Sequence, residues 1–378
     1  MNYPKWKKLT HFSYSNENEK KFKTYLITGG AGYIGCNVVK KLASEGNLVI
    51  VIDNLSNSYE NGILKLKEKY KNIKFYNFDL LNNNKLNKVL SEENIDTVIH
   101  LAGKKYVGES FVNETEYHDN NVKLTRNLLQ LLTKHNIKQL VFSSSITVYG
   151  TTNKAVVDEN TAKQPLSPYA SQKSECEEMI KNWSNETKSQ AIVLRLSNPI
   201  GADTEYLLGD NPKTKKYMGV LPFIINKVKN NEELKFNGGD HLTKDGTTIR
   251  DYVHITDVAN AFVSASQSNI HGFNVMNIGS GGNGYSVLDL LHTVENNLGV
   301  KASYSFGPKR EGDVSIFISN IERAKNFLNF KVTKNLDDMV SSQIEFSSKI
   351  DSWKIIRFLQ INKYSQYTDV KETMHNIQ

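Results

Sequence analysis

Short apolar runs alternate along the chain with segments in which apolar residues recur at helical spacing. Residues 24–28 form the first run, and Ile34, Val38, Val39 and Leu42 follow at helical spacing before Gly46. Similar helical segments, of which 117–135 is the longest, separate the further runs, at 48–52, 73–78, 97–100, 139–144 and 191–196. This alternation predicts an α/β fold with a doubly wound parallel sheet of the Rossmann type.

The turn between the first predicted strand and helix is rich in glycine, with Gly29, Gly32 and Gly35 at a GxxGxxG spacing. Glycines here allow a sharp turn and a close approach to a pyrophosphate, which the start of the following helix attracts. The second predicted strand ends at Asp53, whose carboxylate can accept both hydroxyls of an adenosine ribose and would repel a 2′-phosphate. The pattern therefore predicts a site for NAD rather than NADP.

The periodic pattern loosens beyond Asn198, where a loop rich in Gly, Asp, Pro and Lys occupies 201–219 and a helical segment occupies 336–346. We expect a smaller C-terminal α/β substrate domain there. The predicted parts are a disordered N-terminal extension (1–22), an NAD-binding Rossmann domain (23–198), a substrate-binding domain (199–348) and a C-terminal tail (349–378).

Composition narrows the possible functions. The formal charge of +7 comes from scattered lysines rather than a defined basic patch, so we expect no nucleic-acid partner. No run approaches the ~18 apolar residues of a membrane span, and the first residues do not resemble a secretory signal. Only two cysteines occur, neither in a metal-ligand spacing, so we expect no metal and a reducing, cytoplasmic location.

A candidate catalytic group lies near the start of a predicted helix, where Tyr169 and Lys173 are four residues apart and share one face. Ser145 ends a serine run that follows a predicted strand. Such a set suits oxidation of an alcohol, because the phenolate can take the hydroxyl proton while hydride leaves for NAD⁺. Lowering a phenol pKa from ~10 to ~7 takes about 4 kcal/mol. One positive charge at ~4 Å supplies about that much, so we expect Lys173 and the nicotinamide together to make Tyr169 acidic.

With these motifs the chain resembles the extended short-chain dehydrogenase/reductase family, and within it the members that epimerise UDP-sugars. The resemblance covers about residues 24–346 and depends most on 28–35, 51–58, 101–110, 142–150, 250–254 and 307–313. It implies interconversion of UDP-glucose and UDP-galactose through a 4-keto sugar that turns about its diphosphate link, with NAD held tightly. It also implies a homodimer that pairs helices near 117–135 and 169–183.

The resemblance assigns further residues to the cofactor and the substrate. It places around NAD Gly29, Gly32, Tyr33, Ile34, Gly35, Asp53, Asn54, Leu55, Ser56, Asn57, Ser58, Asp79, Leu80, Leu101, Ala102, Gly103, Lys105, Asn120, Tyr169, Lys173 and Ser197. It places around the UDP-sugar Ser145, Tyr169, Asn198, Gly219, Val220, Leu221, Asn237, Arg250, Arg310, Asp313 and Phe317. Two guanidiniums suit a diphosphate, although Arg250 and Arg310 could instead form ordinary ion pairs with neighbouring carboxylates.

The chain departs from the family pattern at a few of these positions. Leu196 and Ser197 stand where the family usually has an aromatic pair, Asn237 replaces an aromatic residue near the uracil, and Gly219 replaces an asparagine. Phe317 occupies the position that sets pocket size, where a bulky ring predicts a cavity for glucose and galactose. Ordinary core packing is the alternative role for this ring.

Other functions remain open on the same scaffold. A UDP-N-acetylhexosamine 4-epimerase would need a roomier sugar pocket, and a dehydratase needs an added acid and base. Thr147 is followed by Val148 and Tyr149, with no carboxylate, which argues against dehydration. A decarboxylase is a further enzyme alternative. A catalytically idle NAD-binding sensor is the non-enzyme alternative, against which the retained Ser145, Tyr169 and Lys173 speak.

Overall fold

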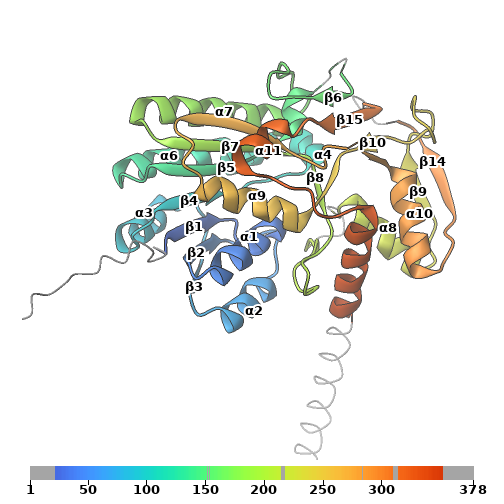
Figure 1. Cartoon of the computed structure of the whole chain (residues 1–378), viewed down its shortest axis with the longest axis horizontal. Helices are drawn as coiled ribbons and strands as arrows, with labels where there is room; N and C mark the ends of the chain where they lie inside the picture. The colour runs from blue at the N-terminus through green and yellow to red at the C-terminus, as the bar shows by residue number, and fades with distance from the viewer. Residues whose placement is uncertain are drawn as a thin grey trace, which may run out of the picture.

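A parallel sheet of seven strands forms the centre of the protein (Figure 1). The computed structural model describes residues 22–150, 152, 154–213, 218–282, 284–309 and 314–351. Neighbouring strands of the central sheet pair in parallel throughout. In spatial order they are β12 (Phe273–Ile278), β7 (Gln190–Leu196), β5 (Gln139–Ser145), β4 (Thr97–His100), β1 (Thr24–Thr28), β2 (Leu48–Asp53) and β3 (Ile73–Asn77).

Helices cover both faces of this sheet, which confirms the doubly wound α/β prediction. One face carries α1 (Tyr33–Ser44), α2 (Asn61–Lys69), α9 (Ile255–Gln267) and α11 (Glu322–Leu328). The other carries α3 (Asn83–Glu92), α6 (Leu124–Lys134) and α7 (Pro168–Thr187). The predicted helix over 117–135 is a run of α5 (Glu114–His118), a π-helical turn η1 (Asp119–Lys123) and α6.

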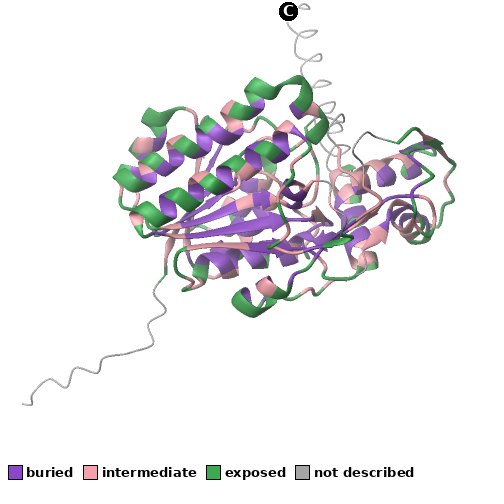
Figure 2. Cartoon of the chain, turned by 90° about the horizontal axis from the view of Figure 1, so that it is seen from above, coloured by how far each residue is buried: buried purple, intermediate pink, exposed green. Residues whose placement is uncertain are grey.

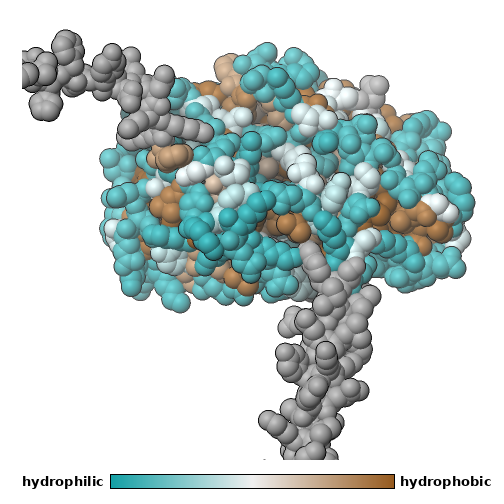
Figure 3. Space-filling model, turned by 60° about the horizontal axis from the view of Figure 1, so that its bottom comes forward, coloured by the Kyte–Doolittle hydropathy of each residue, from teal (hydrophilic) through white to brown (hydrophobic). Residues whose placement is uncertain are grey.

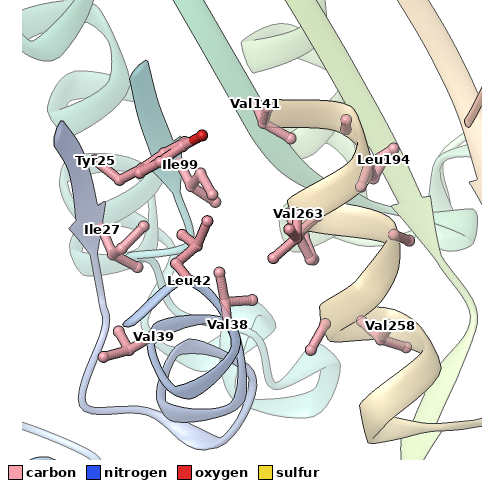
Figure 4. Close-up of a cluster of buried hydrophobic side chains, with 14 of the residues drawn as sticks. Tyr25, Ile27, Val38, Val39, Leu42, Ile99, Val141, Leu194, Val258 and Val263 are labelled. Atoms are coloured by element: carbon pink, nitrogen blue, oxygen red, sulfur yellow. The ribbon is translucent and has the colours of Figure 1, made fainter. Parts of the chain in front are cut away.

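Two apolar cores, one on each face, hold the layers together. Strand residues such as Ile27 and Val141 are fully buried against Val38 of α1 and Val263 of α9 (Figure 4). The inner strands β1, β2, β4, β5 and β7 are buried along most of their length (Figure 2), as expected for a parallel sheet covered on both faces, whereas the edge strands β3 and β12 are less buried. This packing fixes where the strands end, and those ends carry the predicted chemistry.

The rest of the chain builds smaller sheets beside the central one. A four-stranded sheet contains β13 (Tyr285–Ser286), β10 (Ile249–Arg250), β15 (Ile316–Ser319) and β6 (Val156–Val157). Two-stranded sheets pair β11 (Tyr252–His254) with β8 (Asn198–Ile200), and β14 (Tyr304–Gly307) with β9 (Leu234–Asn237). The remaining helices are α8 (Val220–Lys229), α10 (Val287–Leu298), the short α4 (Val107–Val112), the 3₁₀ helix η2 (Ile146–Tyr149) and a last helix over 336–351.

The structure differs from the predicted domain plan in one respect. Strand β12 and helix α9 come from the range predicted as the substrate domain, yet they complete the central sheet and its helical layer. The chain therefore returns to the central sheet after leaving it, and a single boundary at residue 198 does not separate the two parts. The last helix runs to residue 351, past the predicted limit at 348, while 1–21 and 352–378 lie outside the described residues.

The surface is largely polar. On the face shown in Figure 3, hydrophilic side chains predominate and the apolar ones are scattered rather than gathered in one broad area. Among the residues that the structure describes, no helix combines the length and the apolar character that a membrane crossing requires.

Candidate active site

A cavity of about 610 Å³ lies where β1, β2, β3 and β4 end, which is the edge at which open parallel sheets bind ligands. Most residues predicted to bind the cofactor line it. They are Gly29, Gly32, Tyr33, Ile34, Gly35, Asp53, Asn54, Ser56, Asn57, Ser58, Asp79, Leu80, Leu101, Ala102, Gly103, Lys105 and Asn120. The structure thus brings these residues together at one cavity.

The start of α1 opens into this cavity and fits an anion. Gly32 is the N-cap residue, no side chain caps the helix, and no acidic residue lies in its first turn. The helix also packs tightly on the preceding turn, because a Cβ on Gly35 would lie 2.3 Å from the carbonyl oxygen of Gly29. Only glycine is small enough there, so the uncapped N–H groups can approach a pyrophosphate closely.

Asp53 lies at the end of β2, buried in the wall of the cavity. Its carboxylate accepts hydrogen bonds from the backbone N–H groups of Ala31 (3.1 Å) and Leu55 (2.8 Å). Burial raises the pKa of this carboxyl, and the two backbone hydrogen bonds oppose that rise. A carboxylate held so rigidly fits the ribose of NAD, and together with the uncapped helix it matches the two ends of an adenosine diphosphate.

The predicted catalytic residues lie next to the cavity rather than in its lining. Strand β5 ends in the serine run 143–145, and α7 starts at Pro168 with Ser167 as its N-cap. The Nζ atom of Lys173 donates to the carbonyl oxygen of Ser143 (2.9 Å), and a Cβ on Gly103 would lie 3.8 Å from the same Nζ. The lysine therefore links the serine run to the cavity wall.

Tyr169 is buried and hydrogen bonded to Ser145. Burial raises the pKa of Tyr169 to about 12, and the hydrogen bond with Ser145 opposes that rise. The prediction that Lys173 and the nicotinamide together make Tyr169 acidic concerns the loaded site and stays a prediction. The Nζ of Lys173 lies 6.0 Å from the centre of the Tyr169 ring and 4.7 Å from the centre of the Phe142 ring.

The lysine is itself affected by its surroundings. Lys173 is almost fully buried, and burial lowers the pKa of its ammonium group. A buried lysine of this kind changes its charge more readily than an exposed one, which suits a group that works beside a proton acceptor.

The residues predicted to bind the substrate gather on the side of the smaller sheets. Arg250 ends β10, and its guanidinium donates to the carbonyl oxygens of Ile249 (3.0 Å) and Val314 (2.8 Å). Gly219 is the N-cap of α8, so it places the first amides of that helix, whereas the side chain of Leu221 is buried in a core. Asn237 is exposed at the end of β9. Arg310 and Asp313 lie outside the described residues.

Phe317 belongs to β15 and is 93% buried, since 7% of its surface is exposed. It packs in a small cluster with Ile146, Val148 and Tyr149 of η2, directly after the serine run. The ring thus lies close to the end of β5, which carries Ser145, as we expect of a residue that limits pocket size.

Ser197 and Asn198 both form hydrogen bonds with Asp251, the residue that directly follows β10. The Ser197 hydroxyl donates to the Asp251 carboxylate (2.9 Å), and the Asn198 amide donates to the Asp251 carbonyl oxygen (3.3 Å). Ser197 does not appear among the residues that line the cavity, and neither does Leu55, whose backbone carbonyl accepts a hydrogen bond from Lys213. Asp251 was not predicted, although its place directly after Arg250 was a usable signal.

One wall of the cavity has no local sequence pattern that predicts it. Residues 207–212 and the side chains of Phe346 and Ile350, from the last helix, face the glycine loop across the cavity. This wall is assembled by tertiary contacts, because Gln343 both donates to the Asp210 carbonyl oxygen (3.1 Å) and accepts from the Asp210 N–H (3.2 Å).

Comparison with known proteins agrees with this geometry. Residues 25–279 match the model of the NAD dependent epimerase/dehydratase family. The chain belongs to this family. NAD is accordingly the cofactor, in agreement with the glycine loop and Asp53.

Individual relatives span nearly the same length. "UDP-glucose 4-epimerase" of Bacillus subtilis (strain 168) is 33% identical, with 87% of this chain and 98% of the relative covered. "UDP-glucose 4-epimerase 2" of Oryza sativa subsp. japonica is 35% identical, with 86% and 82% covered. The crystal structure of UDP-glucose 4-epimerase from Bifidobacterium longum in complex with NAD⁺ and UDP is 35% identical, with a TM-score of 0.82 and 86% and 98% covered.

Proposed function

We propose that this protein interconverts UDP-glucose and UDP-galactose by transient oxidation at C4 of the hexose. The observation that carries the proposal is the contact between Ser145 at the end of β5 and Tyr169 on α7, with Lys173 beside them at the wall of the dinucleotide cavity. The relatives named above, which cover most of this chain, support the same substrates.

In the proposed mechanism Tyr169 takes the proton of the sugar 4-hydroxyl, and Ser145 orients that hydroxyl by hydrogen bonding. NAD⁺, held by the glycine loop and Asp53, would supply a reversible hydride acceptor, which allows the configuration at C4 to be inverted without net redox change. The proton then returns from Tyr169 to the oxygen at C4. Lys173 contributes positive charge beside the phenolate, which favours the charged form of the tyrosine.

The pKa of about 12 for Tyr169 in the chain alone indicates how much the loaded site must add. The positive ring of the cofactor and a closer approach of Lys173 would both stabilise the phenolate. Arg250 and the start of α8 would hold the diphosphate, because a guanidinium and free helical N–H groups both bind phosphate oxygens. Arg310 and Asp313 complete this proposed set, and Phe317 limits the size of the sugar.

The test uses UDP-galactose that carries deuterium at C4 and the purified protein, without added reductant. We expect UDP-glucose that retains the deuterium, because the hydride is returned to the carbon from which it came. A dehydrated or decarboxylated product would favour the enzyme alternatives, and bound NAD without any product would favour the idle sensor. Preference for UDP-N-acetylglucosamine would favour the hexosamine epimerase.

We also propose a cytoplasmic homodimer. Both cysteines are free and buried, in keeping with a reducing compartment. The pairing surface predicted from 117–135 and 169–183 corresponds to α6 and α7, whose outer sides are joined by an exposed Arg126–Glu175 ion pair at 3.5 Å. Sedimentation analysis of the purified protein tests the dimer directly.

A further inference from the structure

The serine run of β5 holds α7 at three successive points. Ser145 is hydrogen bonded to Tyr169, the carbonyl oxygen of Ser143 accepts from Lys173 Nζ (2.9 Å), and the hydroxyl of Ser144 donates to Glu177 Oε1 (2.6 Å). The three helical partners are spaced four residues apart, so they form one stripe along α7 that faces the strand end. Two of these contacts involve the proposed catalytic residues, and the third has no part in the chemistry.

The third contact is embedded in a buried ionic group. Ser144 and Glu177 are 2% and 1% exposed, and Arg195 is 4% exposed. Arg195 of β7 pairs in register with Ser144 and donates to Glu177 through Nε (2.9 Å) and through Nη2 (2.6 Å). Two neighbouring strands therefore hold the same carboxylate of α7, and such a bidentate, charge-assisted pair has little geometric freedom.

The hydrogen bonds of this buried ionic group extend from β5 toward the smaller sheets. Arg195 Nη1 donates to the hydroxyl of Tyr149 (2.8 Å), and this hydroxyl donates to Asn277 Oδ1 of β12 (2.7 Å). Asn277 in turn donates to the carbonyl oxygen of Val157 in β6 (3.3 Å), next to the strand that carries Phe317. A displacement of Glu177 would thus affect both α7 and the strands beside Phe317.

We propose that Ser144, Glu177 and Arg195 are positioning residues, which fix Tyr169 and Lys173 relative to Ser145 by locking α7 to the ends of β5 and β7. The proposal rests on the proposed function for its kinetic readout. Ser144 is the informative position, because removing its hydroxyl leaves the Glu177–Arg195 ion pair intact and the helix folded. Reactions that depend on a preset geometry lose up to ~100-fold in rate for a displacement of about 1 Å.

The test compares Ser144→Ala with Ser184→Ala in the NAD-loaded protein. Ser184 is a matched control, because it lies on α7 itself, is 2% exposed like Ser144 and also donates a 2.6 Å hydrogen bond, to the carbonyl oxygen of Ser189. It is fifteen residues from Tyr169, or about 22 Å along the helix. We expect Ser144→Ala to lower kcat about tenfold with an unchanged KM and NAD content, and Ser184→Ala to leave kcat unchanged, at equal melting temperatures.

A second readout does not depend on turnover. In protein labelled with ¹³Cζ-tyrosine, the resonance of Tyr169 is assigned by its loss in Tyr169→Phe, and it reports the hydrogen bond with Ser145. It should move in Ser144→Ala and stay in place in Ser184→Ala. An unmoved resonance, or equal kcat in the two variants, would overturn the positioning role. Wild-type protein that fails to convert UDP-galactose, while the resonance moves as expected, would instead count against the proposed function alone.

Discussion

The central sheet and the smaller sheets hold their functional residues in different ways. Strands of the central sheet run for four to seven residues, and their main-chain ladders set the positions of Asp53 and the serine run. In the smaller sheets β6, β10 and β13 have two residues each, too few for such a ladder. Hydrogen bonds of side chains hold these segments in place instead, and those of Asp251 are the clearest case. The cofactor side is therefore fixed by the backbone, whereas the substrate side is fixed by a few buried polar side chains.

The strongest test of this contrast is Tyr169→Phe, which removes the phenolic oxygen beside the end of β5 in the central sheet. We expect turnover to fall by about a thousandfold, because positioned acid–base groups contribute roughly 10² to 10⁴ in rate. Bound NAD, measured by absorbance after denaturation, should remain at the wild-type level. Tyr25→Phe is the matched control, since Tyr25 is buried in β1 of the same sheet. A Tyr169→Phe enzyme with wild-type turnover would remove its role as proton acceptor.

Asp251 tests the other side of the comparison. Its carboxylate is fully buried and accepts from the Ser197 hydroxyl (2.9 Å), the Ser319 N–H (3.0 Å), and both the N–H (2.7 Å) and the hydroxyl (2.6 Å) of Ser280. Asp251→Ala would leave these donors without a partner, so we expect it to lower the free energy of unfolding by about 4 kcal/mol.

A second buried aspartate provides the control for that change. Asp257 of α9 is equally buried and accepts hydrogen bonds from the N–H (2.9 Å) and hydroxyl (2.6 Å) of Thr333. Asp257→Ala should cost about 2 kcal/mol in urea unfolding and leave KM unchanged. Asp251→Ala should also raise KM for the UDP-sugar, because Arg250 is its neighbour in the chain. Equal losses of unfolding free energy in the two variants would contradict the role of Asp251 in holding the substrate side in place.

From the sequence alone, local motifs indicate the part of the cavity around the glycine loop and Asp53 but not the wall that distant segments build, for a physical reason. Gly29, Asp53 and Tyr169 lie within local patterns whose spacing already states the chemistry. Phe346 reaches the cavity only because it packs against Gly209, whose Cβ, if present, would lie 2.3 Å from the ring. Such a contact joins residues over a hundred positions apart and has no local signature. Spacing along a helix also does not reveal that the Nζ of Lys173 lies closer to the ring of Phe142 than to that of Tyr169.

Each side also buries a neutral histidine, which makes stability depend on pH. Burial lowers the pKa of His100 in β4 to about 3 and that of His254 in β11 to about 4, from 6.5. Below pH 6.5 the unfolded chain binds a proton that the folded chain refuses, so stability is full above that pH and falls toward each folded pKa. The slope is about 1.4 kcal/mol per pH unit for each histidine.

Replacing these histidines separates the two contributions. At pH 5 we expect His100→Gln and His254→Gln each to reduce the acid-induced loss of unfolding free energy by about 2 kcal/mol, relative to pH 7. Between pH 4 and 3 only His100→Gln should reduce the loss of unfolding free energy further, because the folded pKa of His100, about 3, lies below that of His254, about 4. Urea unfolding at pH 7, 5, 4 and 3.5 measures both. Parallel pH curves for wild type and variants would show that neither ring stays neutral in the fold.

The smallest expected effect concerns Phe317, where the two sides meet. Its ring packs on η2 directly after the serine run, and its strand belongs to the smaller sheets. If it limits the sugar pocket, Phe317→Cys should raise kcat/KM for UDP-N-acetylglucosamine about tenfold, since the acetamido group needs the space that the ring fills. Phe330→Cys, at a ring that is 5% exposed in the central core, is the control for packing. Both variants should lose roughly 3 kcal/mol of stability from the cavity that they create, but only the first should gain the new substrate. A loss of stability in both with no gain in either would assign Phe317 to the core alone.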